Sequence, residues 1–157
     1  MFRDITTLLK DPVGLRATVQ EIVAHCTDLQ IDKVAGIESR GFIIGAPVAY
    51  ELSRGFIPIR KSGKLPATTV GRDYDLEYGT DRVEIHVDAI NPGERVLLID
   101  DLIATGGTAE AAILLIEDMG GVVAGCCFVV DLPDVGGRSR LEKLGHKPFA
   151  LCQFQGE

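Results

Sequence analysis

The residues at 95–108 combine the side chains needed to bind a phosphorylated sugar. Val96 to Ile99 form an unbroken apolar run, which is typical of a strand buried on both faces of a parallel sheet. Asp100 and Asp101 follow directly, at the expected carboxyl end of this strand, where open α/β sheets bind their ligands. Two adjacent carboxylates can accept hydrogen bonds from both hydroxyl groups of a ribose. We therefore interpret this pair as a site for a sugar diol.

A glycine-containing segment follows the two acids and precedes a helix predicted over 109–119. The segment consists of Ala104, Thr105, Gly106, Gly107 and Thr108. Glycines let backbone N–H groups approach a phosphate, the start of a helix adds a favourable dipole, and threonine hydroxyls supply further donors. The segment lacks the lysine of a Walker loop and the dinucleotide pattern G-x-G-x-x-G. A phosphate loop beside diol acceptors indicates a ribose 5-phosphate site.

The charge of the chain restricts the partners that it can have. The formal net charge is −7 at pH 7, which argues against a general nucleic-acid-binding protein. A polyanionic ligand must then meet a local basic cluster, which Arg40, Arg60, Lys61 and Lys64 provide. No apolar run approaches the length of a membrane span and no signal peptide is recognisable, so we expect no contact with a membrane.

The cysteines show neither metal-binding nor redox spacing. The chain has Cys26, Cys126, Cys127 and Cys152, and we expect buried, reduced thiols in a cytoplasmic protein. Cys126 and Cys127 are neighbours on a predicted strand, so their side chains should point to opposite faces of the sheet.

Strand and helix patterns alternate along the chain and predict one α/β domain over 1–157. Asp11 and Pro12 have the residue types of a helix cap and a first helical position, and Gly79 is expected at the turn of a hairpin. The polar stretch 68–74 is expected to be a mobile loop. Strands are predicted at 34–37, 55–60, 74–78, 83–87, 96–99, 122–130 and 149–154, and helices from 12 and at 42–52, 109–119 and 136–144. This order predicts a doubly wound, mainly parallel sheet flanked by helices.

Several motifs, taken in order, resemble those of the adenine phosphoribosyltransferases within the type I phosphoribosyltransferase family. The resemblance extends over essentially the whole chain. The segment 96–108 is similar to the family's signature for 5-phosphoribosyl 1-diphosphate (PRPP). The other matching segments are F-R-D-I-T at 2–6, E-S-R-G-F at 38–42, R-K-S-G-K-L-P at 60–66 and L-E-Y-G at 76–79.

The resemblance implies a reaction and its partners. Adenine displaces pyrophosphate from PRPP with inversion at the ribose C1 through an oxocarbenium-like state, which gives AMP in purine salvage. It implies Mg²⁺ carried by PRPP rather than by direct protein ligands, with contact to Asp100 and Asp101 through water. It also implies a cytoplasmic homodimer, in which Arg60 is lent by the neighbouring subunit, and a flexible hairpin hood over the active site.

The resemblance further implies a role for particular residues. Glu77, Arg40 and Lys64 are expected to be catalytic, with Glu77 meeting N7 of the base, and Tyr78 is expected in the hood. A non-proline cis peptide is expected between Glu38 and Ser39. The expected pyrophosphate-binding residues are Ser39, Arg40, Arg60, Lys61 and Lys64, and the expected adenine-binding residues are Phe2, Arg3 and Leu102.

Other interpretations remain open at this level. The 95–108 segment could be a strand, turn and helix with an incidental acidic turn, although burying two acids without a partner is costly. The base could be hypoxanthine, xanthine or orotate, or the chain could be a non-catalytic PRPP sensor that regulates transcription. In the family a further segment usually precedes Phe2; because this sequence begins at Met1, we expect the base site to be less complete than the PRPP site.

Overall fold

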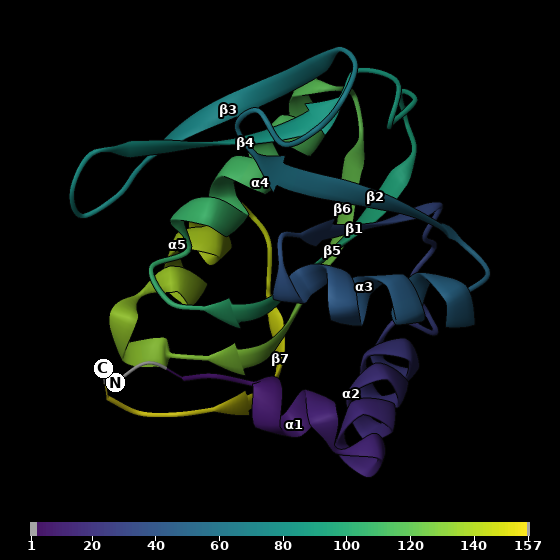
Figure 1. Ribbon diagram of the computed structural model, residues 1–157, viewed down its shortest axis with the longest axis vertical. Coiled ribbons are helices and arrows are strands. Elements are labelled where there is room, and N and C mark those ends of the chain that lie inside the picture. The colour runs from purple at the N-terminus through teal and green to yellow at the C-terminus, as the bar shows by residue number, and fades with distance from the viewer. Residues whose placement is uncertain (1–2, 157) are drawn as a thin grey trace.

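A computed structural model of the chain describes residues 3–156 and contains a seven-stranded sheet in the order β3-β4-β2-β1-β5-β6-β7 (Figure 1). The strands are β1 (Lys33–Ile37), β2 (Gly55–Lys61), β3 (Thr69–Asp75), β4 (Thr80–His86), β5 (Arg95–Ile103), β6 (Val122–Asp131) and β7 (Phe149–Gln153). The helices are α1 (Thr6–Lys10), α2 (Pro12–His25), α3 (Arg40–Glu51), α4 (Gly107–Asp118), the 3-10 turn η1 (Pro133–Val135) and α5 (Gly137–Lys143).

The strand pairing confirms the predicted α/β fold with a mainly parallel sheet. The strands β2, β1, β5, β6 and β7 pair in parallel, whereas β4 pairs antiparallel with both β2 and β3. Ala35 of β1 lies opposite Leu98 of β5, and Gly36 lies opposite Ile99. This register brings the loop after β1 next to Asp100, because the carboxyl ends of parallel strands meet at one edge.

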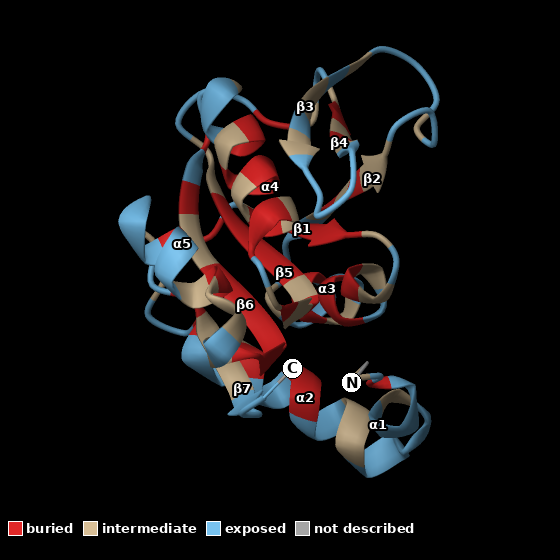
Figure 2. Ribbon diagram, turned by 90° about the vertical axis from the view of Figure 1, so that its left-hand side faces the viewer, coloured by how far each residue is buried: buried red, intermediate tan, exposed pale blue. Residues whose placement is uncertain are grey.

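Alternate residues of the central strand β5 belong to two different hydrophobic cores. Val96 and Leu98 belong to the core on the α4 side, whereas Leu97 and Ile99 belong to the core that includes residues of α2 and α3. All four side chains are fully buried, and Figure 2 shows the buried strands between the helices of the two faces. A strand covered on both faces must be apolar throughout, which explains the unbroken run in the sequence.

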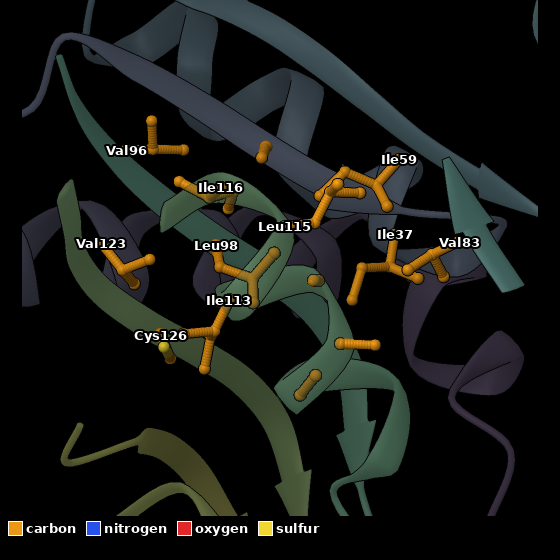
Figure 3. Packing of buried hydrophobic residues seen from close by; sticks show 14 of the residues in the cluster. Ile37, Ile59, Val83, Val96, Leu98, Ile113, Leu115, Ile116, Val123 and Cys126 are labelled. Atoms are coloured by element: carbon orange, nitrogen blue, oxygen red, sulfur yellow. The ribbon is translucent and has the colours of Figure 1, made fainter. Parts of the chain in front are cut away.

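The helix α4 packs its apolar face on the sheet over the middle of β5 and the first half of β6. Ile113 and Ile116 of α4 lie over Leu98, Val123 and Cys126 of the sheet (Figure 3). Ile113 and Ile116 recur at helical spacing, so both side chains reach the same face of the helix.

Helix signals in the sequence are confirmed at the amino end of α2. The carboxylate Oδ2 of Asp11 accepts a hydrogen bond from the backbone N–H of Gly14 over 2.8 Å, and Pro12 is the first helical residue. The helix α3 begins at Arg40, two positions before the predicted start at 42, and contains Pro47 within it. The predicted turn at Gly79 is also confirmed, since this residue has φ +83° between β3 and β4.

The prediction of a mobile loop at 68–74 is wrong, because residues 69–75 form the strand β3. Every residue from Thr69 to Asp75 pairs with β4, from His86 to Thr80. The stretch is polar because β3 is an edge strand with one neighbour, so its composition resembles that of a loop.

The apolar run predicts that Asp100 and Asp101 directly follow the strand. In the structure both acids lie within β5. The strand continues to Ile103 because Leu102 and Ile103 pair with Val130 and Asp131 of β6.

The expectation of four buried thiols is wrong for Cys152, which is exposed; the other three are buried, and all four are free. Cys152 lies near the end of β7, the other edge strand, where less of the chain covers it. The prediction that Cys126 and Cys127 face opposite sides is confirmed, since they belong to different cores.

Truncation of Ile113 should lower the stability of the domain. Its side chain is fully buried, so Ile113→Ala leaves a cavity and is expected to reduce the free energy of unfolding by about 2–5 kcal/mol. Ile43 of α3 is 47% exposed and provides the matched control, because Ile43→Ala should cost much less. Urea denaturation of both variants measures the difference, and equal losses would contradict this account of the core.

Candidate functional site

The loop after β1 packs closely against β5. A Cβ added to Gly41 would lie 3.0 Å from the carbonyl oxygen of Ile99 and 3.1 Å from Oδ1 of Asp100, so this approach favours glycine. The peptide bond between Glu38 and Ser39 is cis, as the resemblance implied. The segments 38–41 and 100–108, predicted as separate parts of one site, therefore lie side by side.

An ion pair joins these two segments. Nε of Arg40 donates to Oδ2 of Asp101 over 2.5 Å, and Asp101 is 6% exposed. The backbone N–H of Asp101 in turn donates to Oδ1 of Asp100 over 2.9 Å. The hydrogen bond that Arg40 donates to the Asp101 carboxylate raises the pKa of Arg40, so the guanidinium stays fully charged. This contact links two residues that were predicted to bind different groups of one ligand.

The carboxyl group of Asp100 is held in an environment that disfavours its charge. Burial, followed by repulsion from the neighbouring Asp101 carboxylate, raises the pKa of Asp100 well above its usual range, and the positive charge of Arg40 offsets only part of this. An acid kept under such conditions gains from a ligand that supplies hydroxyl donors or positive charge. Carboxyl groups with a pKa perturbed in this way are common at functional sites.

The predicted phosphate loop surrounds a cavity of about 180 Å³ lined by Asp100 and residues 102–109. Gly106 has φ +80° and caps α4, and the hydroxyl of Thr105 lies 3.5 Å from the backbone nitrogen of Gly107. The backbone N–H groups at the start of α4 have no acceptor further back in the helix, so they are available to an anion. The loop thus combines a positive φ, a helix start and hydroxyl groups around one small cavity.

A larger cavity of about 610 Å³ lies at the opposite edge of the sheet, before β1 and β2. It is lined by residues 26, 27, 29–32, 51, 52 and 54 and contains no predicted site residue. Size alone therefore does not identify the site, because ligands of open parallel sheets bind at the carboxyl edge.

Glu38 attaches the basic end of β2 to the pyrophosphate-loop segment. Its Oε1 lies 3.3 Å from Nε of Arg60 and accepts the backbone N–H of Lys61 over 2.5 Å. Nη1 of Arg60 also donates to the carbonyl of Lys64 over 3.4 Å. No local pattern in the sequence indicates that Glu38 contacts these cations, because the contact depends on the register of β1 and β2.

The side chain of Lys61 contacts the hairpin instead of the loop after β1. Its ammonium lies 2.5 Å from Oδ2 of Asp81 and hydrogen-bonds the hydroxyl of Tyr74. Burial lowers the pKa of Lys61, but the contacts with Asp81 and Tyr74 outweigh it and raise the value overall. In this conformation Lys61 fastens β2 to the hairpin, and its predicted contact with pyrophosphate stays a prediction.

The remaining predicted residues lie on more exposed segments. Glu77 and the 86%-exposed Tyr78 lie at the tip of the β3–β4 hairpin, where Leu76 donates its N–H to the carbonyl of Gly79 over 2.9 Å. Lys64 is exposed in the loop after β2. Figure 1 shows the β3–β4 hairpin beside α4. Lys64 lies in a different loop, the one that joins β2 to β3.

Two of the predicted adenine-binding residues can be located. Leu102 is half-buried and packs against the core on the α2 and α3 side. The guanidinium of Arg3 lies 4.6 Å from the ring centroid of Phe154, which places the start of the described chain beside its end. Phe2 lies outside the described residues.

No helix within residues 3–156 combines the length and the apolar character needed to cross a membrane. Over the same residues, no three His, Cys, Asp or Glu side chains gather as a group that could hold a metal ion. The two carboxylates of Asp100 and Asp101 nevertheless supply the oxygen donors that Mg²⁺ prefers, as a substrate-carried ion would require.

Comparison with known proteins agrees with this arrangement. The model of the phosphoribosyl transferase domain family matches residues 6–146. An adenine phosphoribosyltransferase of Nitrosospira multiformis is 74% identical over 156 residues, which are 99% of this chain and 89% of that protein.

Solved structures are similar over nearly the same length. A crystal structure of adenine phosphoribosyltransferase from Thermoanaerobacter pseudethanolicus has a TM-score of 0.93 at 44% identity and covers 98% of this chain and 88% of that chain. A Saccharomyces cerevisiae adenine phosphoribosyltransferase, complexed with an imino-altritol bisphosphate and adenine, has a TM-score of 0.87 at 36% identity, covering 94% and 84%. The extent of these matches, together with the site at the carboxyl edge, shows that the chain belongs to the adenine phosphoribosyltransferase family within the phosphoribosyl transferase domain proteins.

Proposed function

We propose that the site at the carboxyl ends of β1 and β5 carries out the reaction of this family. The reaction transfers the 5-phosphoribosyl group of PRPP to adenine and yields AMP and pyrophosphate in purine salvage. The observation that carries the assignment of this site is the 2.5 Å contact between Arg40 and Asp101. It holds a cation suited to pyrophosphate beside the acids suited to ribose, as one ligand containing both groups requires.

The ribose and its 5-phosphate are assigned to β5 and the loop that follows. Asp100 and Asp101 would accept hydrogen bonds from the two ribose hydroxyls, and ligand donors would relieve the unfavourable charge of Asp100. The phosphate would occupy the cavity formed by residues 104–108, where the helix start and the two threonines provide donors.

The pyrophosphate leaving group is assigned to Ser39 and Arg40, with Arg60, Lys61 and Lys64 as further cations. A guanidinium has five N–H donors, so Arg40 can contact pyrophosphate while its Nε remains with Asp101. Lys61 would have to leave Asp81 and Tyr74 to reach the ligand, whereas Lys64 is already exposed. Positive charge here would stabilise the departing group, which is the main electrostatic task of the reaction.

The base is assigned to Phe2, Arg3 and Leu102, with Glu77 and Tyr78 brought over the site by the hairpin. The Glu77 carboxylate would accept the proton that leaves N7 of adenine while N9 attacks the ribose C1 and the bond to pyrophosphate breaks. Mg²⁺ bound to PRPP would neutralise charge on its oxygens, with Asp100 and Asp101 as contacts through water. Orientation of the two reactants would supply much of the remaining acceleration.

We also propose that the protein is a cytoplasmic homodimer. The four free cysteines support a reducing compartment. Ile43 and Tyr50 of α3 are 47% and 82% exposed, and Val13 of α2 is 74% exposed, so apolar side chains are available for a second copy. Sedimentation velocity tests this proposal, and a monomer throughout the micromolar range would contradict it.

The decisive test of substrate choice is AMP formation. Purified protein with PRPP and Mg²⁺ should convert adenine to AMP much faster than it converts hypoxanthine, xanthine or orotate to their nucleotides. Efficient use of one of these other bases would contradict the assignment to adenine. PRPP binding without conversion of any base would instead favour a regulatory protein.

The acids should contribute to PRPP affinity through charge-assisted hydrogen bonds. Asp100→Asn and Asp101→Asn keep the side-chain size, and each is expected to weaken PRPP binding about ten-fold to a hundred-fold, from roughly 1.5–3 kcal/mol per bond. Asp88 is exposed outside the site, so Asp88→Asn is the control. Calorimetric titration measures the affinities, and unchanged binding in the Asp100/Asp101 double variant would refute the ribose assignment.

The same Asp100→Asn change should make the unliganded protein more stable at neutral pH. An acid whose pKa is raised on folding destabilises the folded state above its unfolded pKa, and this penalty grows until the folded pKa is reached. The gain in Tm should therefore be greatest near neutral pH and disappear in acid, below the ordinary pKa of aspartate. A gain that is independent of pH, or a loss at pH 7, would contradict the unfavourable burial of this charge.

Glu77 should affect turnover more than PRPP binding. A carboxylate that assists proton transfer typically contributes about 10²–10⁴ in rate, so Glu77→Ala should lower kcat by that order with saturating adenine. PRPP affinity should stay close to that of the wild type, because its assigned contacts lie on β5 and the loop after β1. The control is Glu21→Ala on the exposed side of α2. Equal turnover in wild type and Glu77→Ala would show that this residue takes no part in the chemistry.

A further inference from the structure

The helix α5 touches the phosphate loop through a residue that has no side chain. Gly137 donates its backbone N–H to the carbonyl oxygen of Ala104 over 2.8 Å. A Cβ at Gly137 would lie 2.5 Å from that oxygen and 2.9 Å from the backbone nitrogen of Gly106, so only glycine allows the approach. α5 therefore begins in direct contact with the backbone assigned to the phosphate.

Arg140 extends this contact to the rest of the loop and to α4. Its Nη1 donates to the carbonyl oxygen of Thr105 over 3.3 Å, and its Nε lies 2.6 Å from Oε2 of Glu110. Figure 1 shows α5 beside α4, the arrangement that lets one guanidinium reach both segments. No motif of the sequence pointed to Arg140, which belongs to a short basic helix far from the loop in the chain.

The position of Glu110 makes this ion pair relevant to the ligand. Glu110 lies in the first turn of α4, beside the N–H groups that face the phosphate cavity. A negative charge here is favourable for the helix dipole but repels a phosphate at the same helix end. The Glu110 side chain is 29% exposed, so solvent screens this repulsion only in part. A cation paired with Glu110, as Arg140 is, would remove most of this repulsion.

We propose that Arg140 is a positioning residue for PRPP, which neutralises Glu110 beside the phosphate loop and fixes the carbonyl of Thr105. The inference rests on the proposed function, because the 5-phosphate of PRPP is the ligand assigned to this loop. It adds a second helix to the phosphate site. The helix α4 supplies the N–H donors, and Arg140 of α5 neutralises Glu110 beside them and holds the Thr105 carbonyl in place.

The first test is the effect of Arg140→Met on the two substrates. The KM for PRPP should rise about three-fold to ten-fold, a modest change because Arg140 is 45% exposed, with kcat and the KM for adenine nearly unchanged. Arg140→Lys should lie between this variant and the wild type, since it keeps the charge but loses one of the two contacts. A KM for PRPP within two-fold of the wild type in Arg140→Met would overturn the proposal.

The matched control is Arg72→Met. Arg72 also pairs with a carboxylate of α4, at 2.8 Å from Oδ2 of Asp118, and is 39% exposed, but its partner lies at the far end of the helix. This control removes the same charge and an ion pair of similar exposure, made with the last residue of α4 instead of its first turn. If it raised the KM for PRPP as much as Arg140→Met does, the effect would belong to general charge or stability and the proposal would fail.

A double variant separates neutralisation from mere attachment of α5. If Arg140 acts by compensating Glu110, then adding Glu110→Gln to Arg140→Met should restore most of the lost PRPP affinity. If Arg140 only fastens α5 to α4, the double variant should bind PRPP no better than Arg140→Met, which would contradict the proposal.

Failure of this inference is distinguishable from failure of the proposed function. A wild-type protein that makes no AMP would contradict the function, whereas calorimetric titration with PRPP alone still measures the affinities of all these variants. Should Arg140→Met not fold, Arg140→Lys and Glu110→Gln provide the same comparison.

Discussion

The contact between Arg40 and Asp101 is the interaction on which the site depends. It lies where the carboxyl ends of β1 and β5 meet, and the parallel register of these strands brings it about. A nearly buried carboxylate requires a cation, and Arg40 supplies one from the first turn of α3. The same cation offsets only part of the burial and of the repulsion from Asp101, so ionisation of the neighbouring Asp100 stays unfavourable and its pKa stays raised. The unfavourable electrostatic environment of Asp100 lowers the stability of the unliganded protein, and hydroxyl donors of a ligand can relieve it. Such a loss of stability at a functional site is a common exchange for activity.

Close backbone approach is the second constraint, and glycines make it possible. Gly41 lets the loop after β1 approach the backbone of β5, and Gly137 lets α5 approach the phosphate loop. Each approach brings a charged side chain with it, Arg40 in the first case and Arg140 in the second. The site is therefore built on backbone segments that pack closely against one another, and the side chains of Arg40 and Arg140 link these segments. The hairpin that carries Glu77 lies outside these segments, since its tip is exposed.

The sequence predicted those features that have local causes. The apolar run at Val96 to Ile99 predicts a strand covered on both faces, and Gly106 and Gly107 predict the turn from β5 into α4. Where order arises from distant pairing, prediction failed: Thr69 to Asp75 looks like a loop, and only β4 makes it a strand. For the same reason Lys61 could be recognised as a cation near the site, but not as a partner of Asp81 on the hairpin. Arg140 gave no signal at all, because its contact with Thr105 depends on how α5 packs.

A crystal structure with PRPP and Mg²⁺ would test the central claim most directly. The account predicts the ribose hydroxyls at Asp100 and Asp101, the 5-phosphate within the loop 104–108, and the pyrophosphate beside Ser39 and Arg40. Arg40 should remain in contact with Asp101 while other N–H groups of its guanidinium bind the ligand. A ribose bound away from Asp100 and Asp101, or a phosphate in the cavity at the opposite edge of the sheet, would contradict the account.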